Sequence, residues 1–322
     1  GGAGYIGSHA VIDLLSAGEE VVVLDNLSTG FDWAVQGAAT LHIGDIADEE
    51  LVDRILHDHA VEAVIHFAGS VVVPESVSDP LKYYLNNTAK SRTLIERCVA
   101  GRVKHFIFSS TAAVYGMLEV SPATEEAALK PMSPYGRSKL MTEWMLEDVA
   151  AAHPVTYAAL RYFNVAGADP EGRVGQSTLN ATHLIKVACE TALGRRPYIE
   201  IFGDDYPTPD GTCIRDYIHV SDLAAAHTAA LHYLRKGGAS LVANCGYGHG
   251  FSVREVLAAV ERAAGHSFEV RQAVRRPGDP ASIVSDPGRV KATLGWTPAH
   301  DDLDRIVSHA LAWERHLGDR NR

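Results

Sequence analysis

The sequence predicts an α/β protein: a doubly wound parallel sheet followed by a smaller C-terminal lobe. Three observations predict this fold. A glycine-rich turn opens a helix at the start of the chain, apolar strands alternate with helices as far as about residue 165, and shorter elements with loops rich in Gly, Pro and Asp follow. Strands that alternate with helices form βαβ units, and their right-handed crossovers build a doubly wound sheet.

The expected elements are identified from apolar runs and from helix start and stop signals. Helices are expected from the glycine-rich turn to about 17, and at 48–59, 80–100, 134–152 and 222–234. Strands are expected at 20–25, 40–45, 63–69, 104–110, 156–162 and 240–245. We place a dinucleotide-binding Rossmann domain at 1–165 and a substrate-binding lobe at 166–322, and expect the segment around 218–245 to rejoin the first domain.

The glycine-rich turn fits the pattern Gly2-x-Gly4-x-x-Gly7 and also Gly1-x-x-Gly4-x-x-Gly7. Glycine allows a backbone to approach a ligand closely, and the free N–H groups at a helix N-terminus attract a pyrophosphate. This fingerprint normally follows a strand, and none precedes Gly1. We therefore expect the sequence to be clipped, without the strand that would be central in the sheet.

An acidic residue, Asp25, ends the next apolar run, 18 positions after Gly7. Dinucleotide-binding folds place an acid about 20 residues on, where it accepts hydrogen bonds from a ribose diol. A carboxylate there repels a 2′-phosphate, so NAD is favoured over NADP. The alternative is that Asp25 only begins a turn with Asn26, Ser28 and Gly30.

Composition narrows the class of protein. Of 322 residues, 46% are hydrophobic and 21% charged, as in ordinary globular proteins, and the net charge of −11 argues against nucleic acid or an anionic membrane as the main partner. The four cysteines form no C-x-x-C pair, which favours free thiols in a reducing cytoplasm. We expect no metal site, because H-E-x-x-H is absent and His57 and His59 stand in a polar helix end.

The candidate catalytic group consists of Thr111, Tyr135 and Lys139. Thr111 follows an apolar strand, and Tyr135 and Lys139 lie four residues apart at a helix start, on one face. A phenol with a pKa near 10 is a poor base, and a nearby ammonium together with a positive nicotinamide ring would favour the phenolate. Any amphipathic helix can contain Y-x-x-x-K by chance, but here the pair follows a nucleotide-binding pattern.

These residues make the sequence resemble the extended short-chain dehydrogenase/reductase family, and within it the nucleotide-sugar 4-epimerases. The resemblance covers essentially the whole chain. Its most specific stretches are Gly1–His9, Leu24–Leu27, His66–Gly69, Ser109–Gly116, Ser133–Lys139, Arg161–Asn164 and Ile201–Leu223.

The resemblance implies a set of NAD-binding residues. They are Gly1, Gly4, Tyr5, Ile6 and Gly7 at the pyrophosphate, Asp25, Asn26, Leu27, Ser28, Thr29 and Gly30 around the ribose, Asp45 and Ile46 at the adenine, and Phe67, Ala68, Gly69, Asn87, Ser109, Tyr135, Lys139 and Phe163 at the nicotinamide half. It also implies the residues that hold a UDP-sugar: Thr111, Tyr135, Asn164, His183, Glu200, Ile201, Phe202, Arg215, Arg276, Asp279 and Ile283.

The activity that the resemblance implies is an isomerase reaction between UDP-glucose and UDP-galactose, through a 4-keto sugar that turns over before it is reduced again. A UDP-N-acetylhexosamine stays open, because Ile283 stands where some members have Tyr near the N-acetyl site. A UDP-pentose or UDP-uronate also stays open. A 4,6-dehydratase needs an acid after Thr111, where this chain has Ala112 and Ala113. A catalytically silent NAD-sensing protein is the remaining alternative.

A homodimer is also expected. The helices at 80–100 and 134–152 carry apolar residues on more than one face: Tyr83, Tyr84, Trp144, Met145 and Leu146. As in the resembled family, two such helices from each subunit could form a four-helix interface. The alternative is that these residues belong to the core.

Overall fold

The structure is a computed structural model that describes residues 1–118, 120–276 and 278–318. Its helices are α1 (Tyr5–Ser16), α2 (Glu49–Asp58), α3 (Val73–Ser78), α4 (Pro80–Tyr83), α5 (Lys90–Ala100), α6 (Pro134–Ala152), α7 (Leu184–Ala192), α8 (Val220–Arg235), α9 (Val253–Ala264), α10 (Gly288–Leu294) and α11 (Leu303–Leu317). Its strands are β1 (Val22–Asp25), β2 (Thr40–Ile43), β3 (Ala63–His66), β4 (His105–Thr111), β5 (Thr156–Tyr162), β6 (Asn164–Ala166), β7 (Ile199–Phe202), β8 (Ile214–Arg215), β9 (Tyr217–His219), β10 (Leu241–Cys245), β11 (Phe251–Ser252), β12 (Val270–Ala273) and β13 (Ser282–Ile283).

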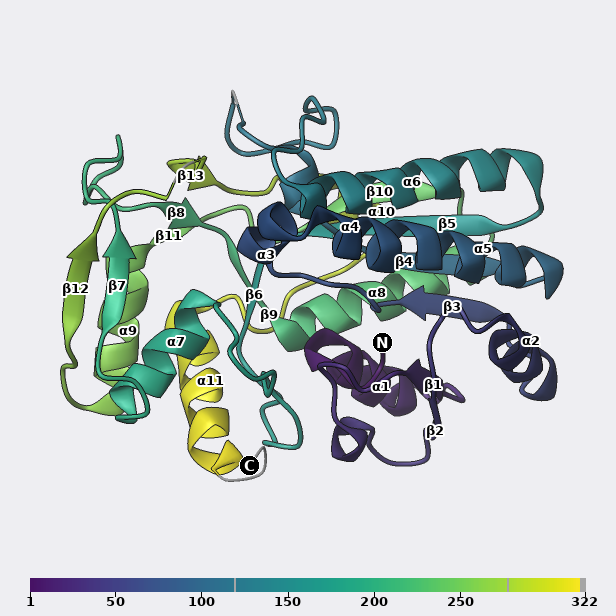
Figure 1. The fold of residues 1–322 in the computed structure, drawn as a ribbon, viewed down its shortest axis with the longest axis horizontal. Helices are drawn as coiled ribbons and strands as arrows, with labels where there is room; N and C mark the ends of the chain where they lie inside the picture. Colours follow the sequence, from purple (N-terminus) through teal and green to yellow (C-terminus); the bar gives the residue numbers. More distant parts are fainter. Residues whose placement is uncertain (119, 277, 319–322) are drawn as a thin grey trace.

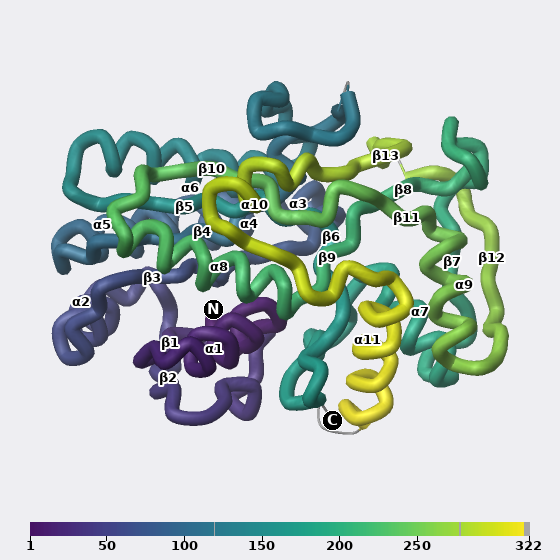
Figure 2. Tube along the Cα trace, turned by 180° about the vertical axis from the view of Figure 1, so that it is seen from behind, coloured from purple at the N-terminus to yellow at the C-terminus, as the bar shows by residue number. Residues whose placement is uncertain are grey.

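The predicted doubly wound α/β fold is confirmed. A four-stranded sheet has the order β10-β5-β4-β3, and all of its pairs are parallel. Helices α4, α5 and α6 lie on one side of this sheet, and α8 and α10 lie on the other (Figures 1 and 2). Both faces of the central strands are therefore covered, and nearly every residue of β4 and β5 is buried.

Strands β1 and β2 form a second, two-stranded parallel sheet. Within the described ranges this sheet shares no ladder with β3, and the start of the chain runs between the two. The Gly1 nitrogen donates to Leu24 O on β1 (2.5 Å), and a Cβ on Gly1 would overlap Ala68 N just after β3. The glycine-rich turn therefore lies where the strand order changes direction, the point at which doubly wound sheets bind ligands.

The helix expected at 80–100 is interrupted. It begins as α4, widens into a π-helical segment at Tyr84–Ala89 and continues as α5, while the preceding α3 was not expected. A π-helical turn holds one more residue than an α-helical turn, and such turns are frequent at functional sites. Here the segment carries Asn87, which is 2% exposed.

The C-terminal half contributes both to the main sheet and to a separate lobe. Strand β10 pairs with β5, so the chain returns to the sheet of the first half. The lobe contains the parallel pair β7–β12, the small sheet β11-β8-β13, and the helices α7, α9 and α11. A division at residue 165 remains a prediction.

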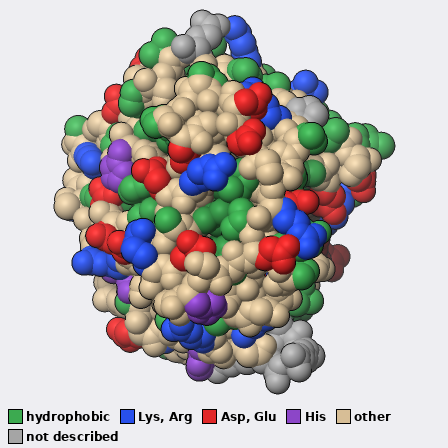
Figure 3. Space-filling model, turned by 90° about the vertical axis from the view of Figure 1, so that its left-hand side faces the viewer, with side chains coloured by type: hydrophobic (Ala, Val, Ile, Leu, Met, Phe, Trp, Pro, Cys, Tyr) green, Lys and Arg blue, Asp and Glu red, His purple; other side chains and the backbone are tan. Residues whose placement is uncertain are grey.

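The outer face of this lobe mixes both signs of charge around a central apolar patch (Figure 3). Arg262 pairs with Asp304 (2.5 Å), and Arg271 pairs with Glu269 (2.7 Å). This face therefore has no broad field of one sign that would attract a polyanion. Among the described residues, no helix combines the length and the apolar content that crossing a membrane requires.

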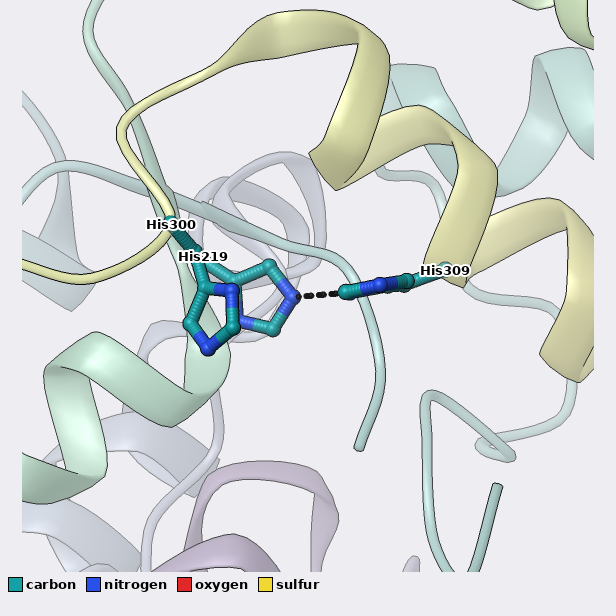
Figure 4. A group of neighbouring side chains, drawn as sticks. All are labelled: His219, His300 and His309. Atoms are coloured by element: carbon teal, nitrogen blue, oxygen red, sulfur yellow. Dashed lines mark hydrogen bonds between the residues drawn. The ribbon is translucent and has the colours of Figure 1, made fainter. Parts of the chain in front are cut away.

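Three histidines join α11 to the start of α8 (Figure 4). The buried His219 accepts the N–H of Ser221 at Nδ1 (3.1 Å), so its proton is on Nε2, which donates to Nδ1 of His309 (3.0 Å). The ring of His300 stacks on His219 at 4.4 Å between centroids. Nitrogens of all three lie within 4.8 Å of one another. Both nitrogens of His219 are already engaged, however, so the group serves packing and offers no complete set of lone pairs to a metal.

Burial, together with the neighbouring His300 and His309, lowers the pKa of His219 from 6.5 to about 2. The unfolded chain therefore binds one more proton than the folded protein between these values. The stability that this histidine contributes is complete above pH 6.5 and declines as the pH falls below 6.5. Each pH unit in that window costs about 1.4 kcal/mol.

We therefore expect His219→Asn, which keeps an N-cap side chain but cannot titrate, to lose less stability than the wild type on acidification. The measurement is the melting temperature at about pH 7.5 and about pH 5.5. His57→Asn, at a histidine with 90% side-chain exposure, is the control and should change nothing. Equal acid sensitivity of His219→Asn and the wild type would show that another group titrates in this window.

Candidate functional site

The parallel strands β3, β4 and β5 end at one edge, and the functional side chains collect there. In the β4–β5 register Thr111 lies opposite Tyr162, and Ser110 lies opposite Arg161. The N-terminus of α6 reaches the same edge: its N-cap Ser133 accepts the N–H of Gly136 (3.2 Å), and Pro134 occupies the first helical position. A capped helix start fixes the direction in which its first side chains point.

Thr111, Tyr135 and Lys139 are all buried, with exposures of 6%, 5% and 2%. The Lys139 ammonium donates to Ser109 O (3.0 Å) and lies 4.8 Å from the centre of the Phe108 ring. The hydroxyl of Thr111 interacts with the Tyr135 phenol. The structure thus brings the three sequence-predicted catalytic residues to one place.

Without a cofactor, burial disfavours the charged forms of both Tyr135 and Lys139. Burial raises the pKa of Tyr135 above 10, although the hydroxyls of Thr111 and Tyr162 act in the opposite direction. Burial also lowers the pKa of Lys139 to about 8, opposed by the charge of Glu143. The protein alone therefore does not favour Tyr135 as a phenolate, because desolvation outweighs the hydrogen bonds of Thr111 and Tyr162.

The π-helical segment connects the end of β3 to this group. Asn87 Oδ1 accepts the N–H of Ser70 (2.7 Å), and its Nδ2 donates to Ser70 O (2.9 Å) and to Ser138 Oγ (3.1 Å). A Cβ on Gly69 would lie 3.1 Å from Asn87 Oδ1 and 3.4 Å from Lys139 Nζ. Residues just after β3 are thereby fixed beside Lys139.

The glycine-rich turn forms an open cradle at the start of α1. Gly4 is the N-cap of this helix and offers no side-chain cap, so the first N–H groups are free to bind an anion. A Cβ on Gly7 would overlap Gly1 O, and one on Gly30 would lie 2.7 Å from Ala3 O, whereas one on Gly4 meets only Gly1 O at 3.5 Å. The cradle thus fits a bound pyrophosphate.

Asp25 lies at the end of β1 against this cradle. One carboxylate oxygen accepts the N–H of Ala3 (2.9 Å), and the other accepts the N–H of Leu27 (2.8 Å), which holds Leu27 at φ 56°. Each oxygen has a further lone pair for a ribose hydroxyl. The turn that sequence reasoning gave as the alternative role is therefore present together with the geometry of the ribose site.

Other predicted cofactor residues are held in different ways. Asp45 pairs with Lys90 (2.5 Å) and accepts from Asn26 (3.4 Å). The side chain of Ile46 belongs to the core, and the ring of Phe67 packs on His227 at 4.8 Å. The hydroxyl of Tyr5 donates to Gly167 O (2.7 Å) and so ties the turn to the segment after β6.

The predicted substrate residues form two groups. Tyr5, Asn164 and His183 line one small cavity beside the glycine-rich turn, and burial lowers the pKa of His183. Asn164 is joined to the second group through Asp216, whose backbone pairs with both Asn164 and Ile283. Ile283 packs against the cluster that contains Phe163.

The second group lies on β7, β8 and β13 and on the segment between β12 and β13. Arg215 pairs with Asp279 (3.0 Å), and the guanidinium of Arg276 lies 3.7 Å from the centre of the Phe202 ring. Glu200 is exposed on β7, and Ile201 is 3% exposed in the main core. The Ile201 side chain is therefore a packing group, and only its backbone can face a ligand.

Sequence reasoning missed two residues at this site. Tyr162 interacts with the phenol of Tyr135, and Glu143 lies one helical turn beyond Lys139. The spacing Tyr135, Lys139, Glu143 repeats every four residues, which was a usable signal. The role of Tyr162 depends on the β4–β5 register, which the sequence does not show.

A phosphate cradle and a Tyr–Lys pair at the same sheet edge define a dinucleotide-dependent enzyme that acts on an alcohol. Known proteins agree with this class. A model of the NAD dependent epimerase/dehydratase family matches residues 1–246. The chain is 58% identical over 317 residues to a UDP-glucose 4-epimerase of Azospirillum brasilense, covering 98% of this chain and 91% of that protein.

Solved structures give the same result. A UDP-glucose 4-epimerase from Brucella ovis in complex with NAD superposes with a TM-score of 0.95 at 45% identity, covering 97% of this chain and 96% of that one. A UDP-glucose 4-epimerase from Bifidobacterium longum in complex with NAD+ and UDP gives 0.93 at 38%, covering 98% and 96%. The chain belongs to the NAD dependent epimerase/dehydratase family and, within it, to the UDP-glucose 4-epimerases.

We expect Gly4→Ala to weaken NAD binding at least tenfold, about 1.4 kcal/mol, because its methyl group enters the cradle without displacing protein backbone. Fluorescence titration with NAD measures the affinity, and the melting temperature of the ligand-free protein should change little. Gly288→Ala, at the start of the distant α10, is the matched control. Wild-type NAD affinity in Gly4→Ala would show that the pyrophosphate binds elsewhere.

Proposed function

We propose that this protein catalyses the NAD-dependent 4-epimerisation of UDP-glucose and UDP-galactose. The observation that carries the proposal is the buried group of Thr111, Tyr135 and Lys139, placed beside the glycine cradle in a chain of this family. NAD, when bound, supplies a reversible acceptor for the hydride from sugar C4. The overall reaction needs no added oxidant, because that hydride returns to the same carbon.

The protein's own residues transfer the proton and orient the sugar. Tyr135 accepts the proton of the 4-hydroxyl, and Thr111 hydrogen-bonds to the same oxygen. Burial makes the free phenol a weak acid, so the Lys139 ammonium and the positive charge of the cofactor must favour the phenolate. The 4-keto sugar then turns about its pyrophosphate link and presents its other face, so that C4 would regain the hydride with inverted configuration while Tyr135 returns the proton to the 4-oxygen.

The nucleotide must stay bound while the hexose turns. Arg215 and Arg276 are suited to a pyrophosphate because guanidinium groups donate in a fork. Arg215 is already oriented by Asp279, and Arg276 by Phe202. Asn164 and His183, beside the cradle, complete the proposed UDP site.

The geometry also bears on the alternative reactions. Thr111 is followed by Ala112 and Ala113, so no acid from this segment can remove water as a 4,6-dehydratase requires. Another UDP-sugar remains the second candidate. Ile283, which packs against the Phe163 cluster, is the side chain that we propose sets the room beside the sugar.

We propose further that the enzyme is a homodimer that works in galactose metabolism in the cytoplasm. Of the apolar residues named on these helices, Trp144 is 51% exposed, whereas Tyr83 and Leu146 are buried at 0% and 2%, as the alternative of core residues expects. The apolar surface instead consists of Trp144 with Leu81 (77% exposed), Leu85 (57%) and Val77 (65%). These residues lie on α6, α4, the π-helical segment and α3, which are adjacent (Figure 1).

We expect Tyr135→Phe to lose about 10²- to 10⁴-fold in turnover, because the group that moves the proton is gone, while UDP binding is retained. The assay is the conversion of UDP-galactose to UDP-glucose without added oxidant, with UDP affinity measured by calorimetry. Tyr157→Phe, which removes a phenol from the core face of β5, is the control. Near-full activity of Tyr135→Phe would overturn the assignment.

We expect the wild type to be a dimer and Leu81→Glu to be a monomer, because a charge at the centre of an apolar interface is not compensated. Light scattering at micromolar concentration measures both. Val274→Glu, at an apolar residue with 87% exposure in the C-terminal lobe, should leave the dimer intact. A monomeric wild type would refute the proposal.

A further inference from the structure

The mechanism above leaves one fully buried ion pair without a role. Glu143 and Arg161 are each 4% exposed, and the guanidinium Nε and Nη2 of Arg161 donate to both carboxylate oxygens at 2.5–3.1 Å. Ser110 also donates to the carboxylate. Breaking such a pair is costly, but replacing it by apolar residues is often neutral, so stability alone does not explain its presence.

The position of the pair connects it to the catalytic group. Glu143 is the third residue of the stripe Tyr135, Lys139, Glu143 on α6, and all three side chains are buried. Its two donors, Ser110 and Arg161, lie opposite each other on β4 and β5 and directly precede Thr111 and Tyr162. One carboxylate therefore joins the helix that carries the Tyr–Lys pair to both strands that face it.

The guanidinium is held on its other side as well. Arg161 Nη1 donates to the Tyr115 hydroxyl (3.1 Å), which donates to Asn244 Oδ1 on β10 (2.6 Å). The carboxylate cannot swing away without leaving Arg161 unpaired in the core. Glu143, with its carboxylate held in place, thus lies one helical turn from Lys139 along α6.

Few other charges face Lys139. On its own helix the neighbours are Glu143 and the neutral phenol of Tyr135. On β5 they are Arg161, already paired with Glu143, and the phenol of Tyr162. On β3 His66 is neutral, because burial lowers its pKa well below 6.5. On β4 Lys139 meets only the Ser109 carbonyl and the Phe108 ring.

We propose that Glu143 is a positioning residue for Lys139: its fixed carboxylate keeps the buried lysine protonated beside Tyr135. This inference rests on the proposed function for its catalytic meaning, but the charge of Lys139 can be measured without turnover. Arg161 and Ser110 hold the carboxylate in place, and no new bond to substrate or cofactor is involved. The direction agrees with the pKa of Lys139, which burial lowers to about 8 and the charge of Glu143 raises.

The primary test is NMR of the full chain with lysine labelled at Cε, in which the Lys139 signal is assigned by its absence in Lys139→Arg. We expect Glu143→Gln to lower the titration midpoint of Lys139 by about one pH unit, the lower end of the effect of a nearby opposite charge. The basic limb of the pH profile of kcat should move in the same direction, with little change in the KM for UDP-galactose.

A second variant separates charge from folding. Glu143→Gln leaves Arg161 unpaired and destabilises the protein, whereas Glu143→Gln with Arg161→Gln removes both charges and should regain melting temperature. We expect the double variant to regain stability but to retain a lowered Lys139 midpoint, because its remaining neighbours are neutral. Ser110→Ala keeps both charges and should leave the midpoint where the wild type has it.

The outcomes are distinct. A wild-type Lys139 midpoint in the stable double variant overturns the proposal and leaves the pair a purely structural element. If the double variant does not fold, Glu143→Asp decides: it keeps the charge and should titrate like the wild type, and a fully lowered midpoint overturns the proposal. A wild type that does not convert UDP-galactose refutes the proposed function alone, because the NMR titration does not depend on activity.

Discussion

The parallel pairing of β4 with β5 is the constraint on which the rest of this structure depends. Its register places Thr111 opposite Tyr162 and Ser110 opposite Arg161. The first pair faces the Tyr135 phenol, and the second holds Glu143 of α6. A shift of β5 by one residue would move Arg161 and Tyr162 to the opposite faces and separate them from Ser110 and Thr111. The functional side chains therefore meet because β4 and β5, which are buried on both faces, can pair in only one register.

The site combines burial with charge. Water is excluded from Tyr135 and Lys139, which makes each interaction stronger but disfavours both charged forms. The charge of Glu143 opposes the effect of burial on Lys139, and the hydroxyls of Thr111 and Tyr162 oppose it on Tyr135. In the proposed mechanism, the glycine cradle beside this group would hold the cofactor, and its positive charge would favour the phenolate. Cofactor binding and readiness for proton transfer would then be coupled through electrostatics.

Much of the secondary structure could be predicted from local sequence patterns. The helix at 134–152 and the strand at 156–162 were predicted at the bounds found, because a capped start and a long apolar run are strong local signals. The π-helical segment was not, since the extra residue in its turn serves contacts between Asn87 and residues far along the chain. Whether Tyr83 and Leu146 belong to an interface or to the core was left open, because sequence shows that a residue is apolar but not which face of its helix meets the core; the structure buries both.

The sequence by itself determined the fold class, the cradle of Gly1, Gly4 and Gly7, and the Tyr135–Lys139 spacing, because these depend on contacts within a few residues. Only the tertiary structure decided which distant residues contact one another and how burial shifts their pKa values. It placed Arg161 against Glu143, 18 positions apart in the chain, and returned β10 to the sheet beside β5. It also raised the pKa of Tyr135, because desolvation depends on everything that surrounds a side chain and no local pattern records it.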